Sequence, residues 1–167
     1  TTEVLNALSM IDGEDADAQS SAGRIRALEK LTESIDGKPS VIISMQLASA
    51  YYEAGQRDKA LSVYDTLLAE GKINQPYKDL VQLNSVRLRI DDISAHKTLI
   101  ETLGPLTKAD RPFRFSAAEL QGILLQNSGQ IDEGNRILSE ISADPGAPQS
   151  LRERARSFVI AAGKNEK

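Results

Sequence analysis

The sequence predicts an all-α fold, a short right-handed solenoid of antiparallel helical hairpins with about nine helices. Apolar residues recur at helical spacing through most of the 167 residues, and Gly or Pro breaks separate the periodic segments. The string GQRDKA at 55–60 returns as GQIDEG at 129–134, which indicates a repeated unit. No stretch favours a strand, and we expect a single domain over residues 1–167.

Composition narrows the classes of function. A net charge of −4 without clustered Lys or Arg argues against nucleic-acid binding, because phosphate contacts need concentrated positive charge. The absence of Cys excludes disulfides, thiolate catalysis and Cys-ligated zinc. The sequence contains no apolar run long enough to cross a membrane.

We expect two N-terminal helices within residues 3–36, the first at 3–11 and the second at 17–35. The linker between them is acidic, with Asp12, Glu14, Asp15 and Asp17. A calcium loop needs Gly at its sixth position and Glu at its twelfth, and neither register here supplies both. We therefore interpret this stretch as a solvated linker and expect no metal site.

The clearest predicted hairpin covers about 41–72. Gly55 ends its first helix, and Asp58 places negative charge in the first turn of its second. Small residues at Ala48 and Ala60 allow the two helix backbones to approach closely. The apolar stripe of the second helix continues through Leu61, Tyr64, Leu67 and Leu68.

Two further hairpins are predicted at about 76–104 and 112–143. In the first, Asp91 and Asp92 are placed to cap the second helix. In the second, Gly122 takes the place of Ala48 at the helix crossing. A capping helix over 147–163 then closes the stack. We expect the buried face of this helix to carry Leu151, Ala155, Phe158 and Val159. Its solvent-exposed face carries Arg152, Glu153, Arg154 and Arg156.

The string RPFRF at 111–115 is the most distinctive local feature. Its two Arg and two Phe residues are suited to anchor a partner peptide or an acidic headgroup. The simpler interpretation, which we favour, is that Phe113 or Phe115 fills the gap between hairpins while Arg111 and Arg114 stay solvated.

We find no catalytic constellation and predict that the protein is not an enzyme and needs no cofactor. His96 is the single histidine, and we interpret it as a surface residue without a catalytic role. No second His, Cys or glycine-rich phosphate loop accompanies it.

The 41–72 hairpin resembles a tetratricopeptide repeat. With Val41 counted as one, the characteristic positions 7, 8, 11, 15, 20, 24 and 27 hold Leu47, Ala48, Tyr51, Gly55, Ala60, Tyr64 and Leu67. The likeness is fair at 115–143 and poor at 77–104. Together with PYKDL from Pro76, PFR from Pro112 and the break at Ala147 and Pro148, the order of features is similar to the YfgM-like family. That family is the periplasmic domain of an ancillary subunit of the bacterial Sec translocon.

The resemblance implies a binding groove made by the first helix of each hairpin. The predicted groove residues are Ile42, Met45, Ser49, Tyr52, Glu53, Ser85, Arg89, Glu119, Ile123 and Gln126. Relatives that read acidic C-termini carry a clamp of Lys, Asn and Arg, which is missing here. The mixed lining favours extended or partly unfolded chains.

The resemblance further implies a non-catalytic protein–protein interaction module. Its expected partners are proteins or peptides, the translocon or a periplasmic chaperone, with neither nucleic acid nor a small-molecule substrate. The implied location is the periplasmic side of a bacterial inner membrane, with a membrane anchor expected ahead of Thr1; the alternative is cytoplasmic. Two other functions stay open: a soluble adaptor in envelope assembly or cell division, and a helical enzyme that uses carboxylates such as Glu53 and Glu119.

Overall fold

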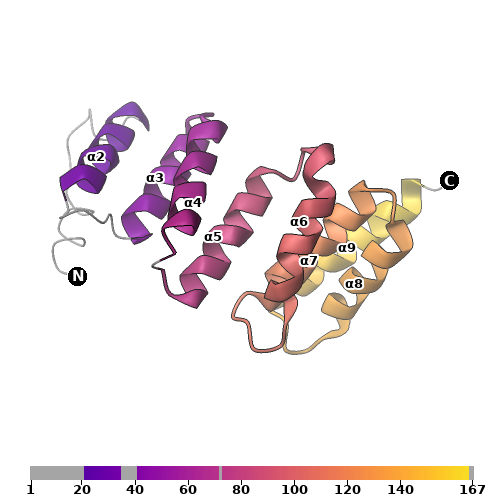
Figure 1. Ribbon diagram of the computed structural model, residues 1–167. Helices are drawn as coiled ribbons and strands as arrows, with labels where there is room; N and C mark the ends of the chain where they lie inside the picture. The colour runs from indigo at the N-terminus through magenta and orange to yellow at the C-terminus, as the bar shows by residue number, and fades with distance from the viewer. Residues whose placement is uncertain (1–20, 35–40, 72, 166–167) are drawn as a thin grey trace. The chain divides into compact units, whose positions relative to one another are not determined.

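The structure is a computed structural model that describes residues 21–34, 41–71 and 73–165 (Figure 1). Over these ranges it contains eight α-helices, two short 3-10 helices and no strand, so the predicted all-α class is confirmed. The predicted helix at 3–11 and the acidic linker lie outside the described residues. The α-helices are α2 (Ser21–Ser34), α3 (Val41–Glu53), α4 (Arg57–Glu70), α5 (Gln75–Leu88), α6 (His96–Leu103), α7 (Arg114–Asn127), α8 (Ile131–Ala143) and α9 (Gln149–Asn165). The 3-10 helices are η1 (Ile93–Ala95) and η2 (Gly104–Thr107).

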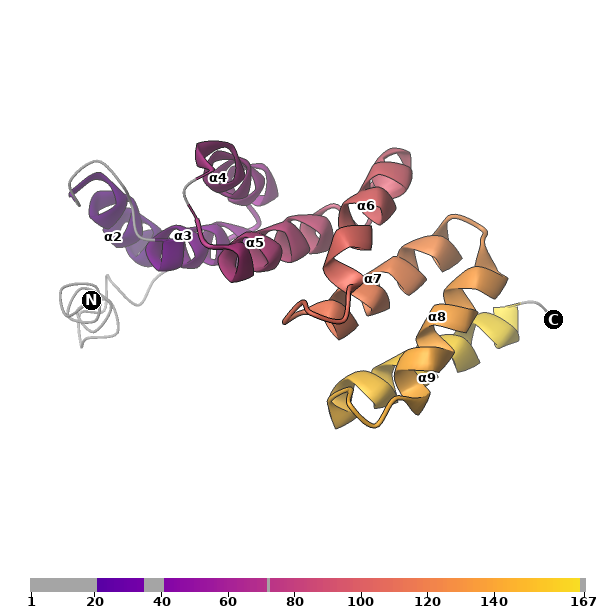
Figure 2. The same ribbon diagram turned by 60° about the horizontal axis from the view of Figure 1, so that its bottom comes forward.

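The chain groups into two compact units, residues 1–81 and 82–167, and the boundary falls inside α5. In the first unit α3 packs against both α2 and α4. In the second unit α7 packs against α6, α8 and α9, and α8 lies beside α9 (Figure 2). The single domain expected from the sequence stays a prediction.

The α3–α4 hairpin turns at Gly55, as the sequence predicts. Gly55 has a φ of +73°, a left-handed conformation that glycine adopts without a steric penalty. Its N–H donates to the Tyr52 carbonyl at 2.9 Å, and the N–H of Gln56 donates to the Tyr51 carbonyl at 2.8 Å. These two bonds are the Schellman pattern, which satisfies the last carbonyls of a helix. Asp58 then lies in the first turn of α4.

The α7–α8 hairpin repeats this turn in the second unit. Gly129 has a φ of +80°, and its N–H donates to the Gln126 carbonyl at 3.0 Å. The N–H of Gln130 donates to the Leu125 carbonyl at 2.9 Å. The two GQ strings noticed in the sequence therefore end their helices with the same hydrogen bonds.

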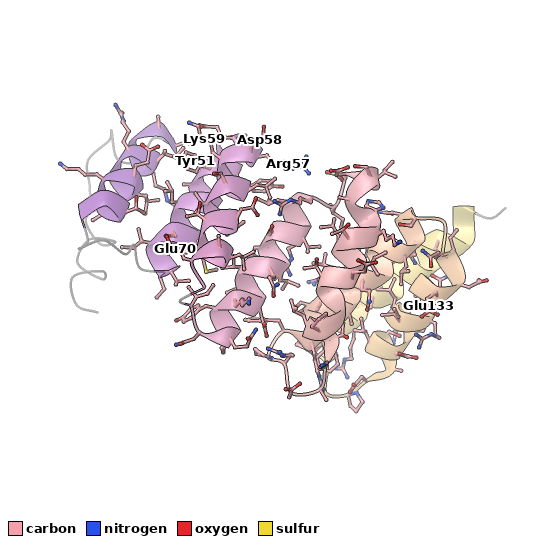
Figure 3. The ribbon with its side chains drawn as sticks, viewed as in Figure 1. Tyr51, Arg57, Asp58, Lys59, Glu70 and Glu133 are labelled. Atoms are coloured by element: carbon pink, nitrogen blue, oxygen red, sulfur yellow. The ribbon has the colours of Figure 1, made fainter. Side chains whose placement is uncertain are left out.

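Tyr51 joins helices α2, α3 and α4 of the first unit. Its buried ring lies on α3, its hydroxyl donates to Glu29 of α2 at 2.5 Å, and the Lys59 ammonium of α4 lies 5.2 Å from its ring centroid (Figure 3). Burial raises the pKa of Tyr51 to about 12, and the hydrogen bond to Glu29 and the charge of Glu29 act in the same direction. All three disfavour the charged phenolate. The phenol therefore stays neutral and bonded at neutral pH.

Small residues bring the helix backbones together in both hairpins. Ala48 and Ala60 are completely buried in the first. In the second, a Cβ on Gly122 would lie 2.8 Å from Leu138 Cγ, and a Cβ on Gly134 would lie 2.6 Å from the Gly122 carbonyl oxygen. Distances below 3 Å leave no room for a methyl group, so glycine is required at this crossing.

Two clusters of buried side chains form the core of the second unit. The first lies among α5, α6, η2 and α7, and Phe113 packs against it. The second lies among α8, α9 and the loop between them, and Phe115 packs against it. The two Phe residues of the RPFRF string thus serve different clusters. Leu151 and Ala155 of α9 are buried, as the capping-helix pattern predicts.

His96 is buried, with only 3% of its surface exposed, so its expected surface position is wrong. One ring nitrogen, Nε2, lies 2.8 Å from the Ile90 carbonyl oxygen, and the other, Nδ1, lies 3.1 Å from Ser128 Oγ. The helix pattern alone missed this because the partners are six and 32 residues away. Asp92 does cap the next turn, where its carboxylate accepts the Ser94 N–H at 3.1 Å.

Candidate partner-binding site

The predicted groove residues fall in both units. Five lie on α3 of the first unit, and the others lie on or directly after α5 and on α7 in the second unit. Their burial differs sharply from one helix to another, and it decides which of them are available to a partner.

The α3 residues form an exposed strip, which we call the α3 face: Ile42, Met45, Ser49, Tyr52 and Glu53. Steps of three, four, three and one residues place them on one side of a helix. Ile42 is 42% exposed and Tyr52 is 55% exposed, whereas Met45 and Ser49 are half-buried. The other sides of α3 are covered, because Ile43, Leu47 and Ala50 are buried.

A small polar network borders the α3 face. Arg24 of α2 donates to Glu53 Oε2 at 3.3 Å and to Gln46 Oε1 at 3.2 Å. Ser49 Oγ donates to Glu53 Oε1 at 3.2 Å. Both charged side chains are more than a third exposed, so this ion pair contributes little stability. Its effect is to hold the Glu53 carboxylate beside the apolar strip.

Of the two predicted residues around α5, Ser85 is turned inward and Arg89 is half-buried. Ser85 is buried, and Arg89 donates a hydrogen bond from Nη1 to the Ser85 hydroxyl. The pair therefore serves the interior of the second unit. Sequence spacing did not reveal this, since both residue types are common on surfaces.

Glu119 is covered by the C-terminal helix and is only 3% exposed. Arg154 of α9 donates from Nε and Nη2 to its two carboxylate oxygens, at 2.9 and 2.7 Å. These bonds and the charge of Glu119 raise the pKa of Arg154 above its ordinary value, because both favour the charged guanidinium. Arg154 is exposed, as expected for the outer surface of α9, with 52% of its side chain accessible, and its guanidinium also reaches Glu119 on α7.

The last two predicted residues, Ile123 and Gln126, are half-buried. Gln126 donates to Asn135 Oδ1 at 2.8 Å, which ties α7 to α8. Its side chain thus serves the hairpin contact. Of the three helices, α3 presents the most accessible predicted surface.

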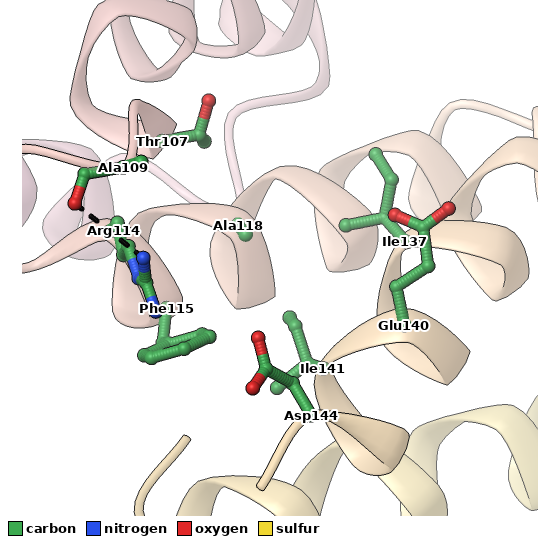
Figure 4. A pocket seen from close by; sticks show the side chains of 9 residues that line it. All are labelled: Thr107, Ala109, Arg114, Phe115, Ala118, Ile137, Glu140, Ile141 and Asp144. Atoms are coloured by element: carbon green, nitrogen blue, oxygen red, sulfur yellow. Dashed lines mark hydrogen bonds between the residues drawn. The ribbon is translucent and has the colours of Figure 1, made fainter. Parts of the chain in front are cut away.

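A pocket that sequence reasoning missed lies in the second unit, with a volume of about 230 Å³ (Figure 4). Arg114 and Phe115 of the RPFRF string form one side, and Ile137, Glu140 and Ile141 of α8 form the other together with Asp144. The RPFRF string was a sequence signal for this pocket, whereas no sequence pattern singled out Asp144.

Among the side chains that the structure describes, no group of three or more His, Cys, Asp or Glu residues is placed to hold a metal ion. No described helix is long and apolar enough to cross a membrane. The acidic residues between Asp12 and Asp17 lie outside the described ranges.

Comparison of the chain with protein-family models, with curated proteins and with solved structures finds no match. The resemblance to tetratricopeptide repeats and to the YfgM-like family therefore stays a prediction, supported by the motifs of the chain and by the geometry of its two hairpins.

Proposed function

We propose that this chain is a non-catalytic protein-binding module of the tetratricopeptide type, and that its α3 face takes an extended segment of a partner protein. The observation that carries the proposal is the exposure of Ile42 and Tyr52 on one side of α3. The same helix is packed on its other sides by α2 and α4. A rigid helix with an exposed apolar strip is a surface that a partner chain can cover without reorganising the module.

The chemistry of the strip favours an extended, mixed partner segment. Tyr is enriched at binding hot spots because it buries a large ring and keeps a hydroxyl for hydrogen bonding. Met45 adds an adaptable thioether side chain, and Ser49 with Glu53 supplies polar groups at the border. Arg24 forms an ion pair with the Glu53 carboxylate, so the strip does not carry a strong net charge. A segment with alternating apolar and polar side chains fits these features.

Two hairpins support the assignment to a solenoid of tetratricopeptide-like repeats. They share the left-handed glycines Gly55 and Gly129 and the same pair of turn hydrogen bonds. They also share small residues at the helix crossing, Ala48 with Ala60 and Gly122 with Gly134. The YfgM-like motifs support the proposal that the partner is the Sec translocon or a periplasmic chaperone. The same motifs support a location on the periplasmic side of the inner membrane.

Binding is tested by fluorescence anisotropy with a labelled, permanently unfolded polypeptide. We expect Tyr52→Ala to weaken binding at least tenfold, which corresponds to about 1.4 kcal/mol. Ile160→Ser is the matched control, because Ile160 on α9 is 54% exposed but lies outside the α3 face. Equal losses for the two variants would show that exposed apolar area in general, and not this surface, binds the polypeptide.

The cellular placement is tested separately by a photo-crosslinking residue at position 52. We expect adducts with translocon subunits or periplasmic chaperones, and none of them from a probe at Arg156, which is exposed on α9. Recovery of cytosolic proteins alone from position 52 would refute the placement while leaving the binding measurement intact.

A further inference from the structure

We propose that the pocket between α7 and α8 binds a free α-amino acid with an apolar side chain. The pocket lies within residues 107–144 of the second unit, so it is independent of the α3 face. Its volume of about 230 Å³ is below the roughly 300–1,000 Å³ of pockets for drug-sized ligands. A single amino acid is the size of ligand that such a space holds.

Two opposite charges enter this pocket. Arg114 and Asp144 lie on either side of the Phe115 ring in Figure 4. The guanidinium carbon of Arg114 is 4.2 Å from the centroid of that ring, so the aromatic face supports the guanidinium plane. Within the described part of the chain neither Arg114 nor Asp144 forms an ion pair.

The two charged groups are close enough for the polar end of one amino acid to reach both. Arg114 Nη2 and Asp144 Oδ1 lie 3.6 and 3.1 Å from the point where a Cβ on Gly146 would stand, and so no more than about 7 Å apart. An α-carboxylate and an α-ammonium, each hydrogen-bonded at about 2.8 Å, span a gap of this size.

A ligand with only one charge is poorly matched. An anion is attracted by Arg114 and repelled by Asp144, and a cation experiences the reverse. Glu140 also lines the pocket, but it is paired with Arg136 at 2.5 Å, which leaves Asp144 as the carboxylate for the ammonium. Asp144 already accepts the Gly146 N–H at 2.7 Å, and this bond orients the carboxylate group.

The remaining lining explains the preference for an apolar side chain. Phe115, Ala118, Ile137 and Ile141 supply carbon surface beside the two charges. A side chain of the size of Leu, Ile or Met buries its methyl groups there, whereas a charged side chain leaves its own charge without a partner. This ligand class departs from the expectation that the protein binds no small molecule.

The test is an NMR titration of the ¹⁵N-labelled 167-residue chain with L-leucine. We expect saturable shifts at the amides of Ala118 and Ile141, and affinities at least tenfold lower for N-acetyl-leucine and for leucinamide, because each analogue lacks one charge. At about 10 mM leucine, a site with a Kd near 1 mM is mostly occupied. The proposal is overturned if no saturable shifts appear up to that concentration. Equal binding of N-acetyl-leucine overturns it in favour of a peptide C-terminus, and equal binding of leucinamide in favour of an N-terminus.

Variants separate this pocket from the rest of the surface. Arg114→Gln removes the carboxylate partner, and Ala118→Leu fills the pocket while leaving both charges; each is expected to lower leucine affinity at least tenfold. Arg156→Gln, a surface cation outside the pocket, and Tyr52→Ala on the α3 face are expected to leave it unchanged. Retained affinity in Ala118→Leu, with an unaltered helical circular dichroism spectrum, refutes the location. Tyr52→Ala reports on binding at the α3 face. The proposed function and the amino-acid pocket can therefore be refuted independently of each other.

Discussion

Glycine at the α7–α8 crossing provides a sharp test of how the second unit is packed. Replacing Gly134 by Ala places a Cβ 2.6 Å from the Gly122 carbonyl oxygen, and that oxygen belongs to the backbone of the facing helix. Replacing Gly122 by Ala places a Cβ 2.8 Å from Leu138 Cγ and 3.2 Å from the Gly134 carbonyl oxygen. No rotamer change relieves the Gly134 contact, because its partner is a backbone atom, and the Gly122 contact is relieved only if the completely buried Leu138 side chain moves. Each variant forces α7 and α8 apart or leaves a strained contact.

The magnitude follows from two opposing effects. Overpacking a tightly packed contact costs about 1–3 kcal/mol. Replacing Gly by Ala within a helix contributes about 0.5–1 kcal/mol in the opposite direction, because Ala loses less backbone entropy on folding. The middle of each range gives a net loss of about 1 kcal/mol for either variant. Gly163 in α9 is the matched control, since a Cβ there meets no atom within 4 Å and Gly163→Ala should gain about 0.5–1 kcal/mol.

Urea unfolding followed by circular dichroism at the helical band measures these differences. With a mid-range slope of about 2 kcal/mol per molar urea, the midpoint should fall by about 0.5 M for Gly122→Ala or Gly134→Ala and rise for Gly163→Ala. A rise in midpoint for all three variants would mean that helix propensity dominates and that the α7–α8 crossing is looser than the contacts above require. The reasoning for a repeat built on small residues at the crossing would then fail.

Three other perturbations have definite expected outcomes. Arg154→Met should destabilise the second unit by about 1–2 kcal/mol in urea unfolding, because it leaves the buried Glu119 carboxylate without its partner. Arg156→Met is the control and should change the stability little. Equal effects of the two variants would contradict the Arg154–Glu119 pair. Leu124→Ala, at a completely buried position, should cost about 2–5 kcal/mol, and a cost below about 1 kcal/mol would contradict the core assignment. Stability should fall as pH rises from about 10 to about 12, because the unfolded phenol of Tyr51 ionises near its ordinary pKa of 10.0 while the folded phenol stays neutral. Tyr51→Phe should flatten this part of a stability–pH curve, and an unchanged slope would refute the assigned environment.

Local features of the fold were predictable from sequence because they depend on single residues and their neighbours. A helix that must end in a left-handed residue selects glycine, so Gly55 and Gly129 mark their turns without tertiary information. Asp92 likewise caps a turn through the N–H of Ser94, two residues away. The residues of the α3 face were named from the resemblance to tetratricopeptide repeats, and helical spacing is consistent with Ile42 and Tyr52 lying on one side.

Pairings between distant residues were not predictable in this way. Glu119 is followed by 34 residues before Arg154, and the string around Arg154 is equally compatible with a fully solvated face. His96 is another case, since its partner Ser128 lies in the turn of the next hairpin. Periodicity indicates which side of a helix is apolar. Whether a polar residue at the edge of that side is buried depends on the helix that packs against it.

The sequence by itself therefore determined the helical class and the hairpin turns at Gly55 and Gly129. These depend on backbone conformation and on a period of 3.6 residues, both of which are local properties. Tertiary structure alone decided that Glu119 is closed off by α9 and that Arg114 and Asp144 face one pocket. The physical reason is that burial and charge pairing depend on which helices meet, and only the packed chain brings those helices together.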